Sequence, residues 1–228
     1  MRKTRDGVYI VVPAYNEGSA VYDVVCELRS LYPNVVVVDD GSHDTTSAEA
    51  KRGGAIVLRH VLNRGQGAAL QTGIAFSVKQ GANVVVTFDA DGQHRVEDVD
   101  RLVAALDTEN ADIAIGSRFL ELRSNLPALR RLMLRVATRF MRMTSGVALT
   151  DAHNGLRAMR RSAAERIHLS IDGMAHASEI VDQIYRLRLR VTEVPVVIHY
   201  SEYSLRKGQS SLAAFRIAFD YLMKRIFR

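Results

Sequence analysis

The sequence predicts an α/β fold whose central sheet is mainly parallel and flanked by helices. Three observations indicate this: short valine-rich runs recur through the first half of the 228 residues, helical stretches separate them, and acidic residues follow three of the runs. Near-continuous apolar runs are typical of parallel strands that are buried on both faces. Ligands bind such doubly wound, Rossmann-like sheets beyond the carboxyl ends of the strands, which is where the acidic residues are expected.

The elements of the first half follow from local patterns. Residues 8–12 form a β-rich run that Pro13 ends, and residues 19–31 then carry valine and leucine at helical spacing. The other expected elements of this half are strands at 35–38, 55–58, 84–88 and 113–115 and a helix at 67–79.

The second half has a basic, amphipathic character. Between residues 118 and 142, seven arginines stand against a single acid, Glu121, and the apolar residues fall on one helical face. A strand is expected at residues 194–199, and a final helix that is both apolar and basic is expected at 212–227. Such helices bind the surface of an anionic bilayer, or they are ordinary core-facing helices with solvated charges.

Composition restricts the class of protein further. Cys26 is the only cysteine, which excludes an internal disulfide, and no cluster of Cys and His suggests structural zinc. No run approaches the ~20 apolar residues that span a bilayer, and the first apolar run is too short for a signal peptide. We therefore expect a cytoplasmic protein that forms a single domain over residues 1–228. Its formal charge of +6 indicates an anionic partner.

Acidic residues gather where three expected strands end. Glu17 follows the first strand, Asp39 and Asp40 follow the second, and Asp89 and Asp91 follow the fourth. Such clusters repel one another unless a cation or hydrogen-bond donors lie among them. Alternate carboxylates of an extended segment can reach one cation, and oxygen ligands favour Mg²⁺ or Mn²⁺. Taken alone, the Asp-Ala-Asp-Gly stretch is more often a turn than a metal site.

Five motifs in a fixed order change that interpretation. They are Pro-Ala-Tyr-Asn-Glu at 13–17, Val-Asp-Asp-Gly-Ser-His-Asp-Thr at 38–45, Asn-Arg-Gly-Gln-Gly-Ala-Ala at 63–69, Asp-Ala-Asp-Gly-Gln-His at 89–94 and Gly-Ser-Arg at 116–118. As a set they resemble the family 2 glycosyltransferases, which have a GT-A fold and invert the anomeric carbon. The resemblance implies that residues 1–117 bind a nucleotide sugar, linked to GDP or UDP, and that residues 118–228 bind the acceptor.

The same resemblance implies roles for single residues. The nucleoside would be held by Pro13, Tyr15, Glu17 and one or both of Asp39 and Asp40, whereas Asp89 and Asp91, with Gln93 alongside, would handle the ribose or diphosphate and the metal. One position departs from the family pattern, because Gln66 stands where a lysine is usual. A positive charge near the diphosphate is then absent, or Arg64 supplies it.

Motifs in the second half are similar to those of the polyprenyl-phosphate sugar transferases, the group that contains dolichol-phosphate mannose synthase. These motifs are Glu-Val-Pro-Val at 193–196, the stretch from 203 to 211, and Asp151 with Asn-Gly-Leu-Arg at 154–157. The resemblance implies that the lipid phosphate would be bound by Arg118, one of Arg130 or Arg131, Arg206 and Ser210, with Arg131 preferred of the pair. It also implies peripheral association with the cytoplasmic face of a membrane.

The chemistry of the acceptor decides whether a general base is needed. A phosphate is already ionised at neutral pH and needs charge-assisted capture, for which the planar fork of arginine is suited. The alternative acceptor is a saccharide hydroxyl in polysaccharide or lipopolysaccharide assembly, which would need a base within hydrogen-bond reach. Asp151 and Glu179 are the candidates for that base, and Glu179 is otherwise explained as a charge near a helix N-terminus.

Two other classes of protein fit the sequence less well. A nucleotidyltransferase also uses paired carboxylates and a metal, but it usually has a basic, glycine-rich first loop, whereas this first loop carries an acid. A nucleic-acid-binding module would explain the basic pI but not the acidic clusters, which would repel phosphates. The oligomeric state does not follow from the sequence.

Overall fold

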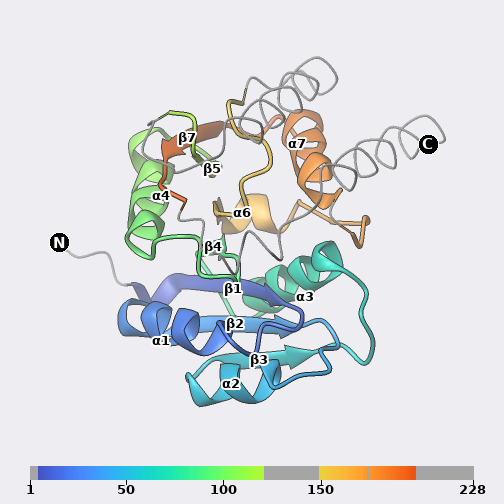
Figure 1. The fold of residues 1–228 in the computed structure, drawn as a ribbon. Coiled ribbons are helices and arrows are strands. Elements are labelled where there is room, and N and C mark those ends of the chain that lie inside the picture. Colours follow the sequence, from blue (N-terminus) through green and yellow to red (C-terminus); the bar gives the residue numbers. More distant parts are fainter. Residues whose placement is uncertain (1–4, 121–148, 174, 199–228) are drawn as a thin grey trace.

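The computed structural model describes residues 5–120, 149–173 and 175–198 (Figure 1). Within these residues, the strands are β1 Val8–Ala14, β2 Asn34–Asp39, β3 Ile56–Arg59, β4 Val84–Thr87, β5 Ile113–Ser117, β6 Arg157–Arg160 and β7 Val191–Pro195. The helices are η1 Arg5–Gly7, α1 Val21–Leu31, α2 Thr46–Arg52, α3 Gln66–Lys79, α4 Glu97–Thr108, α6 Arg161–Ala164 and α7 His176–Arg186.

The strands form one sheet in the order β3-β2-β1-β4-β6-β5-β7. All neighbouring strands pair in parallel except at β6, which runs antiparallel to both β4 and β5. The predicted α/β fold with a mainly parallel sheet is therefore confirmed.

Helices cover both faces of the sheet. Because successive side chains of a strand point to opposite faces, Ile10 and Val12 of β1 pack with α1 and α4, whereas Val11 packs with α3 and α7. The residues of β1, β2, β4 and β5 are nearly all buried, as expected for strands covered on two sides, whereas those of the edge strands β3 and β7 are mostly half-buried or exposed. Among the described helices, none combines the length and apolar composition that a membrane crossing requires.

Two parts of the sheet differ from the sequence prediction. The strand predicted at 194–199 is β7, Val191–Pro195, which begins earlier and tolerates its proline because it lies at the sheet edge and pairs only with β5. β6 was not predicted, because its sequence, Arg-Ala-Met-Arg, has neither an apolar run nor a clean alternation. The helices predicted within 118–142 and at 212–227 lie outside the described residues, except for residues 118–120, which are not helical.

The sheet topology places the motifs together at the edge of the sheet where the parallel strands have their carboxyl ends. β1 and β2 end together, with Ala14 opposite Asp39, and β4 ends at Thr87, opposite Arg157 at the start of β6. β5 ends nearby at Ser117. The loops that follow β1, β2, β4 and β5 and the loop that precedes β6 therefore meet at this edge.

Candidate active site

The loop after β1 is held in place by the loop after β2. The amide of Asn16 donates to Ser42 Oγ (2.9 Å), and the side-chain oxygen of Asn16 accepts the amide of His43 (2.9 Å). The amide of Glu17 donates to Thr46 Oγ1 (2.8 Å). The first two motifs thus form one unit through their own backbone and hydroxyl groups.

The predicted nucleoside residues of the first loop differ in accessibility. Pro13 is buried within β1, whereas Tyr15 is 40% exposed and Glu17 is half-buried. Tyr15 and Glu17 are therefore the side chains of this group that a ligand can reach directly.

Asp39 and Asp40 are both buried, and each has its own set of partners. Asp39 accepts the amide of Ser42 (2.8 Å) and lies 3.5 Å from the guanidinium Nε of Arg59. Asp40 accepts the amides of Arg64 (3.0 Å) and Gly65 (2.6 Å), so it fixes the start of the glycine-rich loop.

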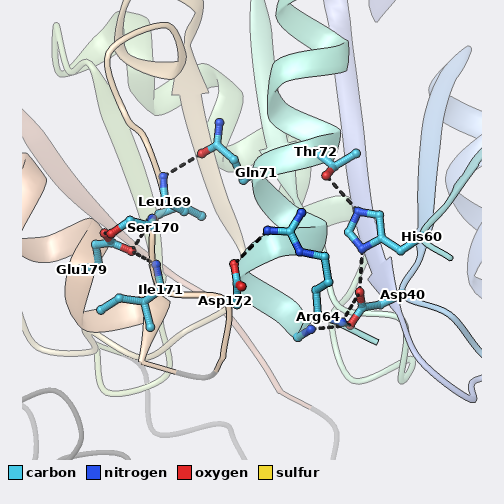
Figure 2. Close-up of polar contacts among 11 residues, drawn as sticks. Asp40, His60, Arg64, Gln71, Thr72, Leu169, Ser170, Ile171, Asp172 and Glu179 are labelled. Carbon is cyan, nitrogen blue, oxygen red and sulfur yellow. Dashed lines mark hydrogen bonds and ion pairs between the residues drawn. The ribbon is translucent and has the colours of Figure 1, made fainter. Parts of the chain in front are cut away.

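His60 extends this arrangement into helix α3. Its Nδ1 lies 2.6 Å from Asp40 and its Nε2 lies 2.9 Å from Thr72 Oγ1 (Figure 2). The imidazole therefore links the carboxylate after β2 to the second turn of α3, which stiffens the loop between them.

The pair Asp89 and Asp91 lies in the segment after β4. Asp89 accepts hydrogen bonds from the side-chain amide of Gln66 (3.2 Å) and from His94 Nε2 (2.9 Å). Asp91 accepts the backbone amide of Gln93 (3.1 Å) and its side-chain amide (2.6 Å). Gln66, where the family pattern has lysine, thus contacts Asp89 with a neutral donor.

The two carboxyl groups have opposite pKa shifts. Burial, together with the negative charge of Asp89, raises the pKa of Asp91 to about 6. Burial also acts to raise the pKa of Asp89, but the hydrogen bond from His94 and the nearby charge of Arg157 outweigh it, so the net shift is downward. A cation between the two carboxylates would remove the repulsion that perturbs Asp91.

Arg64 points toward the second half of the chain. Its Nη2 lies 3.5 Å from Asp172, and the two side chains face each other in Figure 2. The backbone carbonyl of Asp172 also accepts the amides of Gly67 (2.7 Å) and Ala68 (3.3 Å), which caps the start of α3. The amide groups at this helix N-terminus are therefore engaged by protein.

Glu179, a candidate base, holds the segment that carries Asp172. Its carboxylate accepts the amide of Ser170 (3.0 Å), the Ser170 hydroxyl (2.5 Å) and the amide of Ile171 (2.9 Å) (Figure 2). Glu179 is buried on the first turn of α7, which agrees with the alternative explanation of this residue as a charge near a helix N-terminus. This arrangement favours a positioning role, and a role as base stays a prediction.

Asp151, the other candidate base, is fully buried and pairs with an arginine. Its Oδ2 lies 2.6 Å from Arg118 Nε and also accepts the Arg118 amide (3.2 Å). Glu193 fixes the backbone around it by accepting the amides of Thr150 (2.8 Å) and Asp151 (3.0 Å). Asp151 thus orients Arg118, a predicted phosphate ligand. Arg131, Arg206 and Ser210 lie outside the described residues.

Arg157 lies in this region, and the sequence indicated it only as the last residue of a motif. It is 1% exposed, and burial lowers the pKa of its guanidinium to about 10, while Asp89 and Asp151 act to raise it. The only signal for it was the Asn-Gly-Leu-Arg stretch, which does not reveal that the arginine is buried between two acidic segments.

The family follows from comparison with known proteins. The family model described as "Glycosyl transferase family 2" matches residues 9–168. The chain is a family 2 glycosyltransferase. The match runs from the start of β1 beyond β6, so it spans the loops that follow β1, β2, β4 and β5 and the loop that precedes β6.

Relatives of this glycosyltransferase include lipid-phosphate enzymes. A polyprenol monophosphomannose synthase from Mycolicibacterium smegmatis is 34% identical and covers 92% of this chain and 84% of its own. A UDP-N-acetylglucosamine–dolichyl-phosphate N-acetylglucosaminyltransferase from Methanococcus voltae is 29% identical and covers 95% of both chains. The predicted resemblance to the polyprenyl-phosphate sugar transferases is thereby confirmed.

A solved structure supports the fold of the glycosyltransferase. Glucosyl-3-phosphoglycerate synthase from Mycobacterium tuberculosis, in complex with Mn²⁺, UDP-glucose and phosphoglyceric acid, matches with a TM-score of 0.73 over 94% of this chain and 77% of its own. Sequence identity is 20%, so the match bears on the fold, which is GT-A.

The side chains of this glycosyltransferase supply only part of the ligands that a divalent cation needs. In the described part of the chain, no three His, Cys, Asp or Glu side chains gather into a group that could hold a metal ion alone. Asp89 and Asp91 supply carboxylate oxygens, which Mg²⁺ and Mn²⁺ prefer. Mg²⁺ sites commonly combine one or two carboxylates with phosphate oxygens and water, and this pair fits that arrangement.

Proposed function

We propose that this glycosyltransferase transfers a hexose from a GDP- or UDP-linked sugar to a polyprenyl phosphate, with inversion and with Mg²⁺ or Mn²⁺ at Asp89 and Asp91. The observation that carries the proposal is the pairing of Arg118 with buried Asp151 at the same sheet edge as the two aspartates. The pair supports the proposal, because an anionic acceptor requires an oriented cation beside the donor site.

The donor half supports binding of a nucleotide sugar. The loops after β1 and β2 form one rigid unit, and Tyr15 and Glu17 are accessible upon it. In this proposal Tyr15, Glu17 and the Asp39–Asp40 pair hold the nucleoside, with Pro13 shaping the loop. Gln93, which donates twice to Asp91, fixes the carboxylate beside the diphosphate.

The reaction would be a single displacement. A cation held by Asp89 and Asp91 would supply positive charge to the diphosphate leaving group. Arg118, held by Asp151, would bind the acceptor phosphate so that one ionised oxygen faces the anomeric carbon, with Arg131, Arg206 and Ser210 completing the phosphate site. That oxygen forms the new bond as the bond to the diphosphate breaks, so no proton has to be removed by the enzyme.

A saccharide hydroxyl is the alternative acceptor, and the engaged carboxylates favour it less. Such a reaction needs a base that can reach the hydroxyl proton. Glu179 already accepts three hydrogen bonds from Ser170 and Ile171, and Asp151 is occupied by Arg118 on one oxygen. A phosphate acceptor needs neither group as a base.

A binding experiment tests the acceptor side separately. We expect the protein to pellet with liposomes that contain anionic lipid and to be released by high salt, because attraction to a charged surface is screened. Arg206→Ala should raise the KM for a short polyprenyl phosphate at least tenfold and leave donor affinity nearly unchanged. A silent Arg206→Ala, together with no liposome binding, would favour a saccharide acceptor.

A further inference from the structure

Arg157 is a buried cation whose polar atoms are not satisfied by hydrogen bonds. Its Nε and Nη1 are buried and have no hydrogen-bond partner. Among the described residues, the other buried side-chain atoms without a partner belong to Asp151, His153 and His94, which all lie in the same region. Unpaired buried groups are costly, so their concentration in one place of the fold calls for an explanation.

The sheet order places Arg157 between two acidic segments. β6, on which it lies, is flanked by β4 on one side and β5 on the other. Asp89 follows β4, whereas Arg118, with its partner Asp151, follows β5. Both carboxylates interact electrostatically with the guanidinium of Arg157.

Arg157 forms no ion pair with either carboxylate, so its charge acts on both through the buried surroundings. Asp151 uses Oδ2 for Arg118 and leaves Oδ1 buried without a partner. On the other side, Gly155, two residues before Arg157, lies directly against the Asp89 carboxylate. The charges thus alternate in the order Arg118, Asp151, Arg157 and Asp89, from the proposed acceptor side to the proposed metal side, and of these only Arg118 and Asp151 form an ion pair.

We propose that Arg157 is a positioning residue that couples the two halves of the site by sharing its charge between Asp151 and Asp89. The inference rests on the function proposed above, since it needs a metal at Asp89. When Asp151 neutralises Arg157, Asp89 keeps its negative charge for the metal. When Asp151 does not neutralise Arg157, the guanidinium of Arg157 competes with the metal for the carboxylate of Asp89. An acceptor phosphate bound by Arg118 would neutralise part of the charge that Asp151 now neutralises, which leaves more of the Asp151 charge to Arg157. Acceptor binding and metal binding should therefore strengthen each other.

The test is a double-mutant cycle read out as Mn²⁺ affinity. Mn²⁺ binding is measured by EPR, with Mn²⁺ alone and with inorganic pyrophosphate as a mimic of the leaving group that carries no base. Asp151→Asn should weaken Mn²⁺ binding at least threefold, although Asp151 has no hydrogen bond to Asp89. In the Arg157→Gln background, the same substitution should change Mn²⁺ affinity by less than about 1.5-fold, because the competing cation is absent.

Arg160→Gln is the matched control, since Arg160 lies on the same strand and forms an ion pair with Asp107 (2.7 Å) at the opposite end of the strand. Asp151→Asn should keep its full effect in that background. Equal weakening in the Arg157→Gln background, or no weakening in the wild type, would overturn the inference while leaving the proposed function standing. Failure of the wild type to bind Mn²⁺ at all would overturn both.

Thermal unfolding shows whether Arg157→Gln folds. If it does not, Arg157→Lys replaces it, because lysine keeps the positive charge but not the planar fork. The effect of Asp151→Asn should then fall by at least half on a logarithmic scale, because a lysine ammonium cannot face both carboxylates at once. An undiminished effect would contradict the shared-charge arrangement.

Discussion

Gly155 lies against the carboxylate of Asp89 so closely that a Cβ on this glycine would stand 2.1 Å from Asp89 Oδ2. The atom it would meet is the end of a side chain, so the carboxylate rather than the backbone has to move. Gly155, just before β6, therefore limits the position of a proposed metal ligand that follows the neighbouring strand β4.

Gly155→Ala is expected to lower kcat/KM at least tenfold by displacing Asp89. The free energy of unfolding should fall by no more than about 2 kcal/mol, since only one side chain is displaced. Steady-state kinetics and urea unfolding measure the two effects. Gly173→Ala is the control, because a Cβ there meets no atom within 4 Å. Equal kinetic losses in the two variants would contradict the role given to Gly155.

Chelation should abolish turnover, and Mn²⁺ or Mg²⁺ should restore it. Asp91→Asn should lower kcat at least a hundredfold, because charge that develops on the diphosphate would lose its neutralising partner. Metal-dependent activity is measured after dialysis against EDTA and readdition of each ion. Full activity in excess EDTA would refute the proposed metal site.

Acid should destabilise the fold through His176. Burial, with the nearby charge of Arg157, lowers the pKa of this histidine to about 4, below its ordinary value of 6.5. Between these values the unfolded chain binds the proton and the folded chain does not, so stability falls as pH drops from 6.5 to 4. The full effect is about 3 kcal/mol.

His176→Asn should lose less stability on acidification than the wild type. Between pH 7 and pH 4.5, the difference should be about 2–3 kcal/mol in urea unfolding. Replacement of His43, which is exposed, serves as the control and should leave the pH dependence as in the wild type. An identical pH dependence in His176→Asn and the wild type would show that His176 is not the group responsible.

Glu179→Gln separates a positioning role from a catalytic one. The variant keeps one acceptor but loses the charge that holds Ser170 and Ile171, so the free energy of unfolding should fall by about 1.5–3 kcal/mol. Donor KM should rise, because the segment that caps α3 is loosened, while the shape of the pH profile of kcat should stay the same. Loss of the acidic limb of that profile, where activity rises as a base loses its proton, would instead identify Glu179 as a base.

The central strands and the carboxylate edge could be predicted from the sequence because each depends on local pattern. Short valine-rich runs identify β1, β2 and β4, and parallel topology brings the residues after them to one edge. The family motifs then assigned chemistry to that edge, and the comparisons confirm the family and the fold.

The remaining features depend on contacts that have no local signature. β6 is a central strand with arginine at both ends, and its pairing with β4 and β5 follows only from the folded topology. The link from Glu179 through Asp172 to the start of α3 joins residues about a hundred positions apart. The engagement of Asp151 by Arg118 was likewise not visible, since neither residue type reveals its partner.

The most direct test of the central claim is a transfer assay with a panel of UDP- and GDP-sugars and a short polyprenyl phosphate, in the presence of Mn²⁺. The account predicts that one donor releases its nucleoside diphosphate only when the lipid phosphate and the metal are both present. The anomeric configuration of the sugar in the product, read by NMR, should be inverted. Transfer to a saccharide hydroxyl with no use of the lipid phosphate, or retention of configuration, would contradict the account.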